Sequence, residues 1–288
     1  MAGGLKRQWK AYKRDPASFF LFFSVCLAAL LTVLAFAFII AYILIKGIPN
    51  ITPELFDRNY TTENVSLLPA LVNTLSIMLL SLMFAVPAGI GAAIYLTEYA
   101  RRDNKLARIT GIAAETLSGI PSIVYGLFGS LFFVKYLGFG LSLLSGALTL
   151  SIMILPLIMR TTEEALRGVP DSYREGSFGL GAGKLRTVFS VVLPCAVPGI
   201  LSGVILGIGR IVGESAALIF TAGTVAEIAD SIFSSARTLS VHMYSISGEG
   251  LYINQTYATA VVLLVVVILI NWLSGFAAKK IGGNKADG

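Results

Sequence analysis

Six long apolar stretches constrain this chain more than any other feature of its sequence. A hydrocarbon core about 30 Å thick needs about 20 apolar residues in a helix. The stretches lie at roughly 19–45, 67–97, 109–134, 137–159, 196–222 and 257–278. Charged residues make up 13% of the chain, whereas soluble domains carry about 25%. We therefore expect an all-α membrane protein with six transmembrane helices.

The first stretch, 19–45, follows five basic residues, as the apolar part of a signal peptide would. A signal peptide has an apolar region of only about 7–15 residues and a small-residue cleavage site. Here the run is longer and ends at Lys46 and Gly47 without such a site. We expect a retained first transmembrane helix, followed by a membrane-spanning core over 67–278.

The basic residues predict the orientation of the chain in the membrane, because cytoplasmic segments are enriched in Lys and Arg. With the N-terminus inside, the inner segments hold seventeen of the 22 basic residues and the outer segments hold four. The inner segments are 1–18, 98–108, 160–195 and 279–288. Both termini are thus expected in the cytoplasm, with a basic tail at 1–18, a cytoplasmic loop at 160–195 and an outer loop at 223–256. The net charge of +6 then reflects orientation rather than nucleic-acid binding.

No residues suggest catalysis, a metal site or a cofactor. The two cysteines and the one histidine, His242, have no metal-ligand spacing. The segment GLGAGKL resembles a phosphate-binding loop, but that motif needs G-x-x-x-x-G-K-[ST]. Phe178 stands in place of its first glycine and Leu185 in place of its hydroxyl residue. We expect no ATP site in this chain, so any ATP hydrolysis belongs to a separate subunit.

The inner segment 160–195 contains a predicted short helix. Ser172 and Glu175 form an S-x-x-E capping box, in which Ser172 caps the helix start. Gly181 or Gly183 suits the helix end. A short polar helix projecting from a membrane bundle is suited to docking in a groove of a partner.

The same segment resembles the loop of binding-protein-dependent ABC importer permeases, which has the form E-A-A, three residues, G, nine residues, I-x-L-P. Glu175-Gly176-Ser177, Gly181 and Val191-Val192-Leu193-Pro194 keep that spacing, with small or conservative departures. The resemblance implies the type I (MetI-like) importer permease fold. It also implies that this helix is the coupling helix, seated in a cleft of the ATPase subunit. The coupling residues would be Ser172, Tyr173, Arg174, Glu175, Gly176, Ser177 and Gly181.

The fifth stretch carries two charges, Arg210 and Glu214, four residues apart and therefore expected on one helix face. Charges in a span cost at least about 2.5–3.5 kcal/mol, so they face the bundle interior and indicate function. One interpretation is a structural ion pair. The preferred one is that Arg210 is a transient site for an oxyanion, whose oxygens fit the guanidinium fork, with Glu214 orienting it.

Several segments resemble one branch of the importer permeases, the A-type subunit (PstA) of phosphate importers. The run from Gly209 to Ala222 matches G-R-x-x-G-E-[ST]-A and its sequel, which adds Ser215 to the expected pathway residues. Ala217 departs from this pattern, where the branch often has proline. Further matches are AIYLTEY at 93–99, LSGIPSIVYGLFG at 117–129 and RTLSVHMY at 237–244.

This branch implies a phosphate importer in the inner membrane. The implied partners are a homologous PstC-like permease, two ATPase subunits and an external phosphate-binding protein, with membrane lipid around the bundle. Three alternatives remain: a permease for sulfate or molybdate, a self-sufficient secondary transporter, and a scaffold or sensor without transport of its own.

The outer loop 223–256 shows helical spacing of apolar residues, at Ile228, Ile232, Ala236, Leu239 and Met243. We expect a helix that lies along the membrane surface. The alternative is a contact with a substrate-delivering protein.

Overall fold

The structure, a computed structural model, describes residues 16–100 and 104–283. Most of the expected basic tail 1–18 lies outside these residues, as do Arg101, Arg102 and the last five residues of the chain. The α-helices are α2 (Pro16–Gly47), α3 (Leu68–Ile94), α4 (Lys105–Ser118), α5 (Ser122–Gly129), α6 (Leu143–Arg167), α7 (Asp171–Gly179), α8 (Lys184–Thr187), α9 (Leu193–Val212), α10 (Ala216–Thr221), α11 (Leu239–Glu249) and α12 (Ile253–Gly283). Two short 3₁₀ turns, η1 (Ile48–Asn50) and η2 (Pro53–Phe56), follow α2, and three π-helical turns extend longer helices: η3 (Tyr95–Tyr99), η4 (Ser130–Tyr136) and η5 (Val188–Val192).

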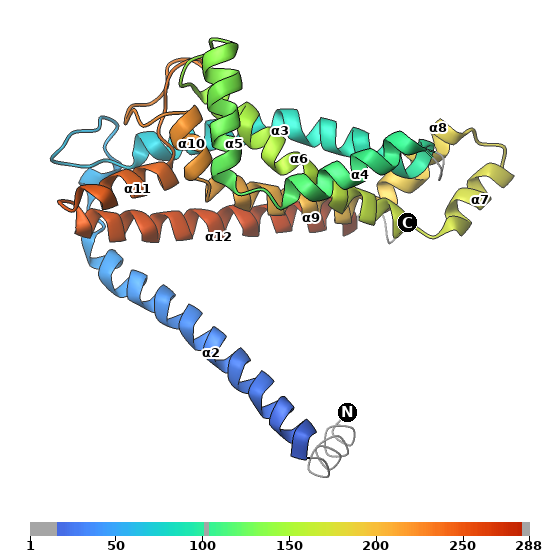
Figure 1. The fold of residues 1–288 in the computed structure, drawn as a ribbon, viewed down its shortest axis with the longest axis horizontal. Coiled ribbons are helices and arrows are strands. Elements are labelled where there is room, and N and C mark those ends of the chain that lie inside the picture. The colour runs from blue at the N-terminus through green and yellow to red at the C-terminus, as the bar shows by residue number, and fades with distance from the viewer. Residues whose placement is uncertain (1–15, 101–103, 284–288) are drawn as a thin grey trace.

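Five helices are long and apolar enough to cross a membrane, and a bent helix pair makes a sixth candidate span. The all-helical class with six candidate spans is therefore confirmed. The third stretch, however, is not one straight helix, because the chain bends by 106° between α4 and α5 (Figure 1). Pro121 stands at this corner in an extended conformation and supplies no backbone N–H for a continuous helix.

The bundle is built around α6, which packs between α3 and α9, while α12 lies along α9 (Figure 1). Ile154 and Ile158 of α6 are fully buried among residues of α3, α9 and α10. By contrast, α2 diverges from the bundle in Figure 1 and contacts mainly α12, near Tyr42 and Tyr257. Nothing in the apolar window of α2 is buried in this chain. Its apolar surface is therefore available to lipid or to another membrane subunit.

The expected bounds of the fourth and fifth spans were also wrong. The fourth span begins at Leu143 rather than near 137, because Gly138 and Gly140 take positive φ angles that interrupt the helix. It continues to Arg167, so the first part of the expected loop 160–195 is helical. The fifth span is a continuous helical run over Lys184–Val212, with Gly213 as its C-terminal cap. The last part of the expected span forms a separate helix, α10.

The expected helix over 228–243 is also only partly present. Residues 223–238 follow an irregular path, and α11 begins at Leu239. The Asn73 side chain of α3 binds this path, since its Nδ2 donates to the Glu227 carbonyl at 2.8 Å and its Oδ1 accepts from Ala229 N at 3.1 Å. Thr74 Oγ1 accepts from Leu239 N at 2.8 Å. Side chains of α3 thus hold the segment against the bundle.

Small residues set how closely α5 approaches α10, and a Gly126→Ala substitution tests this. A Cβ at Gly126 would lie 2.7 Å from Ala217 Cα, so the backbones must separate. We expect a loss of about 1–3 kcal/mol, the usual cost of overpacking. The measurement is thermal unfolding of the purified protein in detergent. Gly91→Ala in α3 is the control, because a Cβ there meets nothing within 4 Å and should leave stability equal or slightly higher.

Candidate coupling helix and translocation site

The predicted short helix is present as α7, at the end of the bundle opposite α11 (Figure 1). It begins at Asp171, with Pro170 as the capping residue and no side-chain capping bond. The predicted Ser172 capping box is therefore wrong, because Pro170 is already placed at the boundary and Ser172 lies inside the first turn. Asp171 instead puts a negative charge at the positive end of the helix.

The predicted exit of this helix at Gly181 agrees with the structure. Gly181 has φ +80°, a left-handed conformation that favours glycine. Its N–H donates to the Phe178 carbonyl at 2.9 Å, and Ala182 N donates to the Ser177 carbonyl at 3.1 Å. This pair of bonds is a Schellman motif, which satisfies the last carbonyls of α7.

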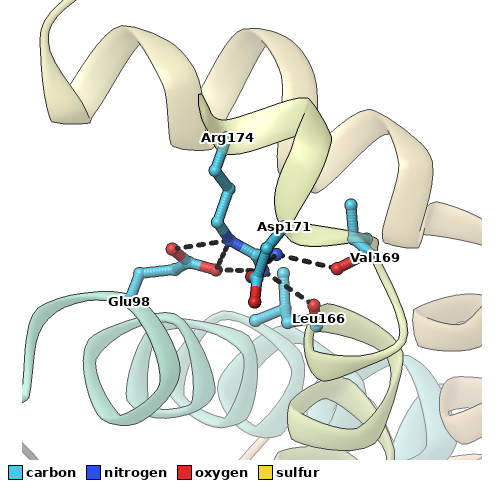
Figure 2. A network of polar contacts seen from close by, with 5 residues as sticks. All are labelled: Glu98, Leu166, Val169, Asp171 and Arg174. Atoms are coloured by element: carbon cyan, nitrogen blue, oxygen red, sulfur yellow. Dashed lines mark hydrogen bonds and ion pairs between the residues drawn. The ribbon is translucent and has the colours of Figure 1, made fainter. Parts of the chain in front are cut away.

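Arg174 fixes α7 to the rest of the bundle (Figure 2). Its Nε and Nη2 donate to the Glu98 carboxylate at the end of η3, the shortest distance being 2.7 Å from Nη2 to Oε1. Nη2 also donates to the Leu166 carbonyl at 2.9 Å, and Nη1 donates to the Val169 carbonyl at 2.8 Å and to Asp171 Oδ1 at 3.1 Å. Every N–H of the guanidinium therefore has an acceptor.

The Arg174–Glu98 pair is largely buried. The side chains of Arg174 and Glu98 are 16% and 8% exposed. The hydrogen bonds that Arg174 donates to Glu98 raise the pKa of Arg174 above its usual value, so the guanidinium stays charged. By comparison, the side chain of Arg167, which pairs with Glu163 on α6, is 68% exposed. The buried pair is thus the stronger candidate for a structural connection between α7 and α3.

A second connection runs from the segment after α7 to the same turn, η3. Lys184 Nζ lies 5.1 Å from the centroid of the Tyr99 ring. Ser177 and Thr187 share a hydrogen bond of 2.8 Å, which ties α7 to α8. A polar cavity of about 770 Å³ is lined by residues of η3, α4, α6 and α7, among them Glu98 and Arg174. Residues before and after the end of α7, Arg174 and Lys184, therefore both contact η3.

The remaining surface of α7 is open. Ser172, Tyr173, Glu175 and Gly176 are exposed, whereas Arg174 and Ser177 are half-buried. Phe178 and Leu180 are also exposed, Leu180 at 91%. A carboxylate beside apolar side chains on a short exposed helix is a surface suited to protein docking.

The second candidate site is the break between α9 and α10, and here one expectation was wrong. Arg210 is in the last turn of α9, but Glu214 lies beyond the helix end at Val212. Glu214 Oε1 instead accepts from Ala217 N at 3.1 Å, at the start of α10. Within the described chain, no ion pair joins Arg210 to Glu214. The two charges do not share a helix face because Gly213 ends the helix between them.

The surroundings of Arg210 leave its guanidinium accessible. Arg210 is exposed in this chain. Ser215 follows Glu214 as the capping residue of α10, and the Leu218 amide donates to its carbonyl at 3.1 Å. Helix breaks at membrane depth occur where protein or a water-filled cavity satisfies the backbone. The break thus places a cation that has no ion pair among the described residues beside irregular backbone.

Two features of these sites were missed by sequence reasoning. Glu98 was not singled out, although it lies inside the AIYLTEY segment. Its partner Arg174 is 76 residues further along the chain, so the sequence alone does not indicate the pair. The available signal was a carboxylate at the end of a span, beside a basic inner segment. Ser240 was also missed, and its hydroxyl donates to the Glu214 carbonyl at the break.

The chain was compared with known proteins and structures. Residues 85–283 match the family described as binding-protein-dependent transport system inner membrane component. The probable ABC transporter permease protein YqgI of Bacillus subtilis is 33% identical over 285 residues, covering 91% of this chain and 96% of that protein. The phosphate transport system permease protein PstA 1 of Mycobacterium tuberculosis is 36% identical over 205 residues, covering 70% and 67%.

Solved structures establish the same fold. A crystal structure of a bacterial ABC transporter involved in the import of alginate superposes with a TM-score of 0.67 at 18% identity, covering 96% of this chain and 99% of that one. The helical architecture is the MetI-like importer permease fold, as expected. The chain therefore belongs to the binding-protein-dependent transport system inner membrane components, the membrane-spanning permeases of ABC importers.

Proposed function

We propose that this chain is a permease subunit of an ATP-driven importer for inorganic phosphate and forms half of the translocation pathway. The observation that carries the proposal is α7, an exposed short helix fixed to the bundle by Arg174 and ended by Gly181. Phosphate is supported by the similarity to PstA 1 and by the exposed Arg210 at the helix break, which has no ion pair among the described residues. The chain has no catalytic role, and ATP hydrolysis takes place on a separate ATPase subunit.

The exposed face of α7 would dock into a cleft of that ATPase subunit. Tyr173 and Glu175 lie on the exposed side of the helix, and Phe178 adds apolar area. When the ATPase moves, Arg174 would transmit the displacement to Glu98 and thereby to η3 at the end of α3. Because α3 packs along α6, this movement would reach the centre of the bundle.

Arg210 would bind the oxyanion in transit. A guanidinium forms two parallel hydrogen bonds to phosphate oxygens. Release requires that binding is weak enough for the ion to leave. Glu214 accepts from Ala217 N, and Arg210 has no ion pair within the described chain, so its guanidinium would be open to a substrate oxyanion. Sulfate and molybdate would fit the same donors, so substrate competition is part of the test.

The proposed assembly contains a homologous PstC-like permease, two ATPase subunits and an external phosphate-binding protein. The apolar surface of α2, exposed in this chain, would be covered by lipid and by the second permease. The bundle would lie in the inner membrane with α7 and both chain ends in the cytoplasm, as the distribution of basic residues predicts.

Purification and reconstitution test this function. We expect the tagged chain to co-purify with an ATPase subunit and a second permease. We also expect vesicles containing the complex to take up labelled phosphate only with ATP and the binding protein. Excess unlabelled phosphate should compete more strongly than sulfate or molybdate. Uptake by this chain alone would identify a secondary transporter, and a complex that hydrolyses ATP without any uptake would favour a sensor.

A further inference from the structure

The segment before α11 contains a buried cation without a counter-charge. Arg237 is 5% exposed, and its Nε and Nη2 atoms are buried without a hydrogen-bond partner. No carboxylate in residues 16–100 or 104–283 lies within ion-pair distance of it. A buried guanidinium that has no anion beside it and two nitrogens without acceptors is strongly unfavourable. A ligand that supplies them would remove this cost.

His242, in the first turn of α11, also lacks hydrogen-bond partners among the described residues. It is fully buried, and both ring nitrogens lack a partner. Burial, followed by the charge of Arg237, lowers the pKa of His242 from 6.5 to about 3. The imidazole is therefore neutral at cellular pH and offers one N–H donor and one acceptor nitrogen.

Tyr60, from the segment between η2 and α3, covers both side chains. Its ring lies 4.9 Å from the Arg237 guanidinium carbon, and it meets the His242 ring edge-on at 6.1 Å between centroids. The face of an aromatic ring partly offsets a positive charge. However, it provides no acceptor for the buried N–H groups. Tyr60 therefore closes the cluster without satisfying its polar atoms.

We propose that Arg237 and His242 form a second phosphate-binding site at the α11 end of the bundle, covered by Tyr60. This inference rests on the proposed function for the identity of the anion. Phosphate oxygens would accept from the Arg237 fork and from the imidazole N–H. Phosphate also keeps a proton at neutral pH, so its O–H can donate to the remaining imidazole nitrogen. Sulfate has no proton to donate, so the same site disfavours it.

The position of the cluster suits an entry site for the pathway. Thr238, next to Arg237, caps α11, and Ser240 in its first turn donates to the Glu214 carbonyl at the α9–α10 break. The first turn of α11 thus connects the Arg237–His242 cluster to the helix break that follows Arg210. Phosphate leaving Arg237 would pass towards Arg210 when Tyr60 moves aside.

Phosphate binding to the purified permease complex, measured without ATP or binding protein, tests the site. The background is Arg210→Ala, which removes the pathway cation, so that any remaining site is measured alone. We expect labelled phosphate to bind by equilibrium dialysis and to raise the melting temperature. Adding Arg237→Gln should weaken binding about 10- to 100-fold, because a charge-assisted bidentate contact is lost. His242→Leu should reduce the preference for phosphate over sulfate, and Tyr60→Phe, which keeps the ring, should change neither.

The outcomes are decisive for the site and separate from those of the transport test. If the Arg210→Ala complex binds no phosphate, or binds it equally after Arg237→Gln, the site is absent even where ATP-driven uptake by the unmodified complex stands. Should Arg237→Gln unfold the complex, Arg237→Lys replaces it, and unchanged affinity there would also overturn the proposal. Binding of phosphatidic acid in place of free phosphate would assign the cluster to a lipid headgroup and likewise overturn it.

Discussion

An Arg210→Ala protein is expected to lose phosphate uptake while keeping or gaining stability. The lost interaction is a charge-assisted contact to the substrate, about 1.5–3 kcal/mol, so uptake should fall about 10- to 100-fold. Stability should not fall, because Arg210 has no ion pair within the described chain and an unpaired charge in a span is costly. The measurements are initial uptake rates in vesicles and thermal unfolding of the same preparations.

Two variants separate this role from that of a structural ion pair. Glu214→Gln keeps an oxygen that can accept from Ala217 N, so it should reduce uptake much less than Arg210→Ala does. Arg210→Lys keeps the charge but not the planar fork and should fall between them. A structural pair would instead make Arg210→Ala and Glu214→Gln similarly destabilising. Uptake at the normal rate by a well-expressed Arg210→Ala protein would refute a pathway role.

The sequence predicted those transmembrane helices whose bounds depend only on the length and apolarity of a stretch. The stretches 19–45, 67–97 and 257–278 correspond to α2, to α3 with η3, and to α12. The breaks were not predictable from apolarity, because a bent pair and a straight span have the same hydropathy. Pro121 and Gly213 stood at these breaks, but proline and glycine also occur within intact membrane helices.

The coupling segment was predicted better than the segment around α11. The spacing of residues along one short segment located α7 and gave Gly181 as one of two candidate ends, since a helix and its cap are local structures. By contrast, the path of residues 223–238 depends on Asn73 and Thr74, which are more than 150 positions away in the chain. The helical spacing of apolar residues there did not indicate one helix, since Ala236 is buried within the irregular path, Ile232 is exposed, and only Leu239 and Met243 lie in α11.

An Arg174→Ala protein is expected to release α7 from α3. Removing one partner from a largely buried pair leaves the other charge unsatisfied, which costs about 3–5 kcal/mol. Glu98 and the carbonyls of Leu166 and Val169 would all lose their donor. A cost of about 3 kcal/mol corresponds to about a 100-fold larger open population. Hydrogen exchange of the backbone amides in 171–179 should therefore accelerate about 100-fold.

The functional expectation for Arg174→Ala is uncoupling, with ATP hydrolysis by the complex continuing while phosphate uptake per ATP falls at least about tenfold. Arg167→Ala is the matched control, because Arg167 also pairs with a glutamate near the end of α6 but is 68% exposed. An exposed pair contributes only about 0.3–0.5 kcal/mol, so exchange and uptake should be nearly unchanged. Glu98→Gln should resemble Arg174→Ala in uptake, because both end the ionic contact to η3. If Arg167→Ala and Arg174→Ala behave alike, Arg174 acts only as a surface charge, and motion of α7 reaches the bundle through the backbone of α6 and α8 instead.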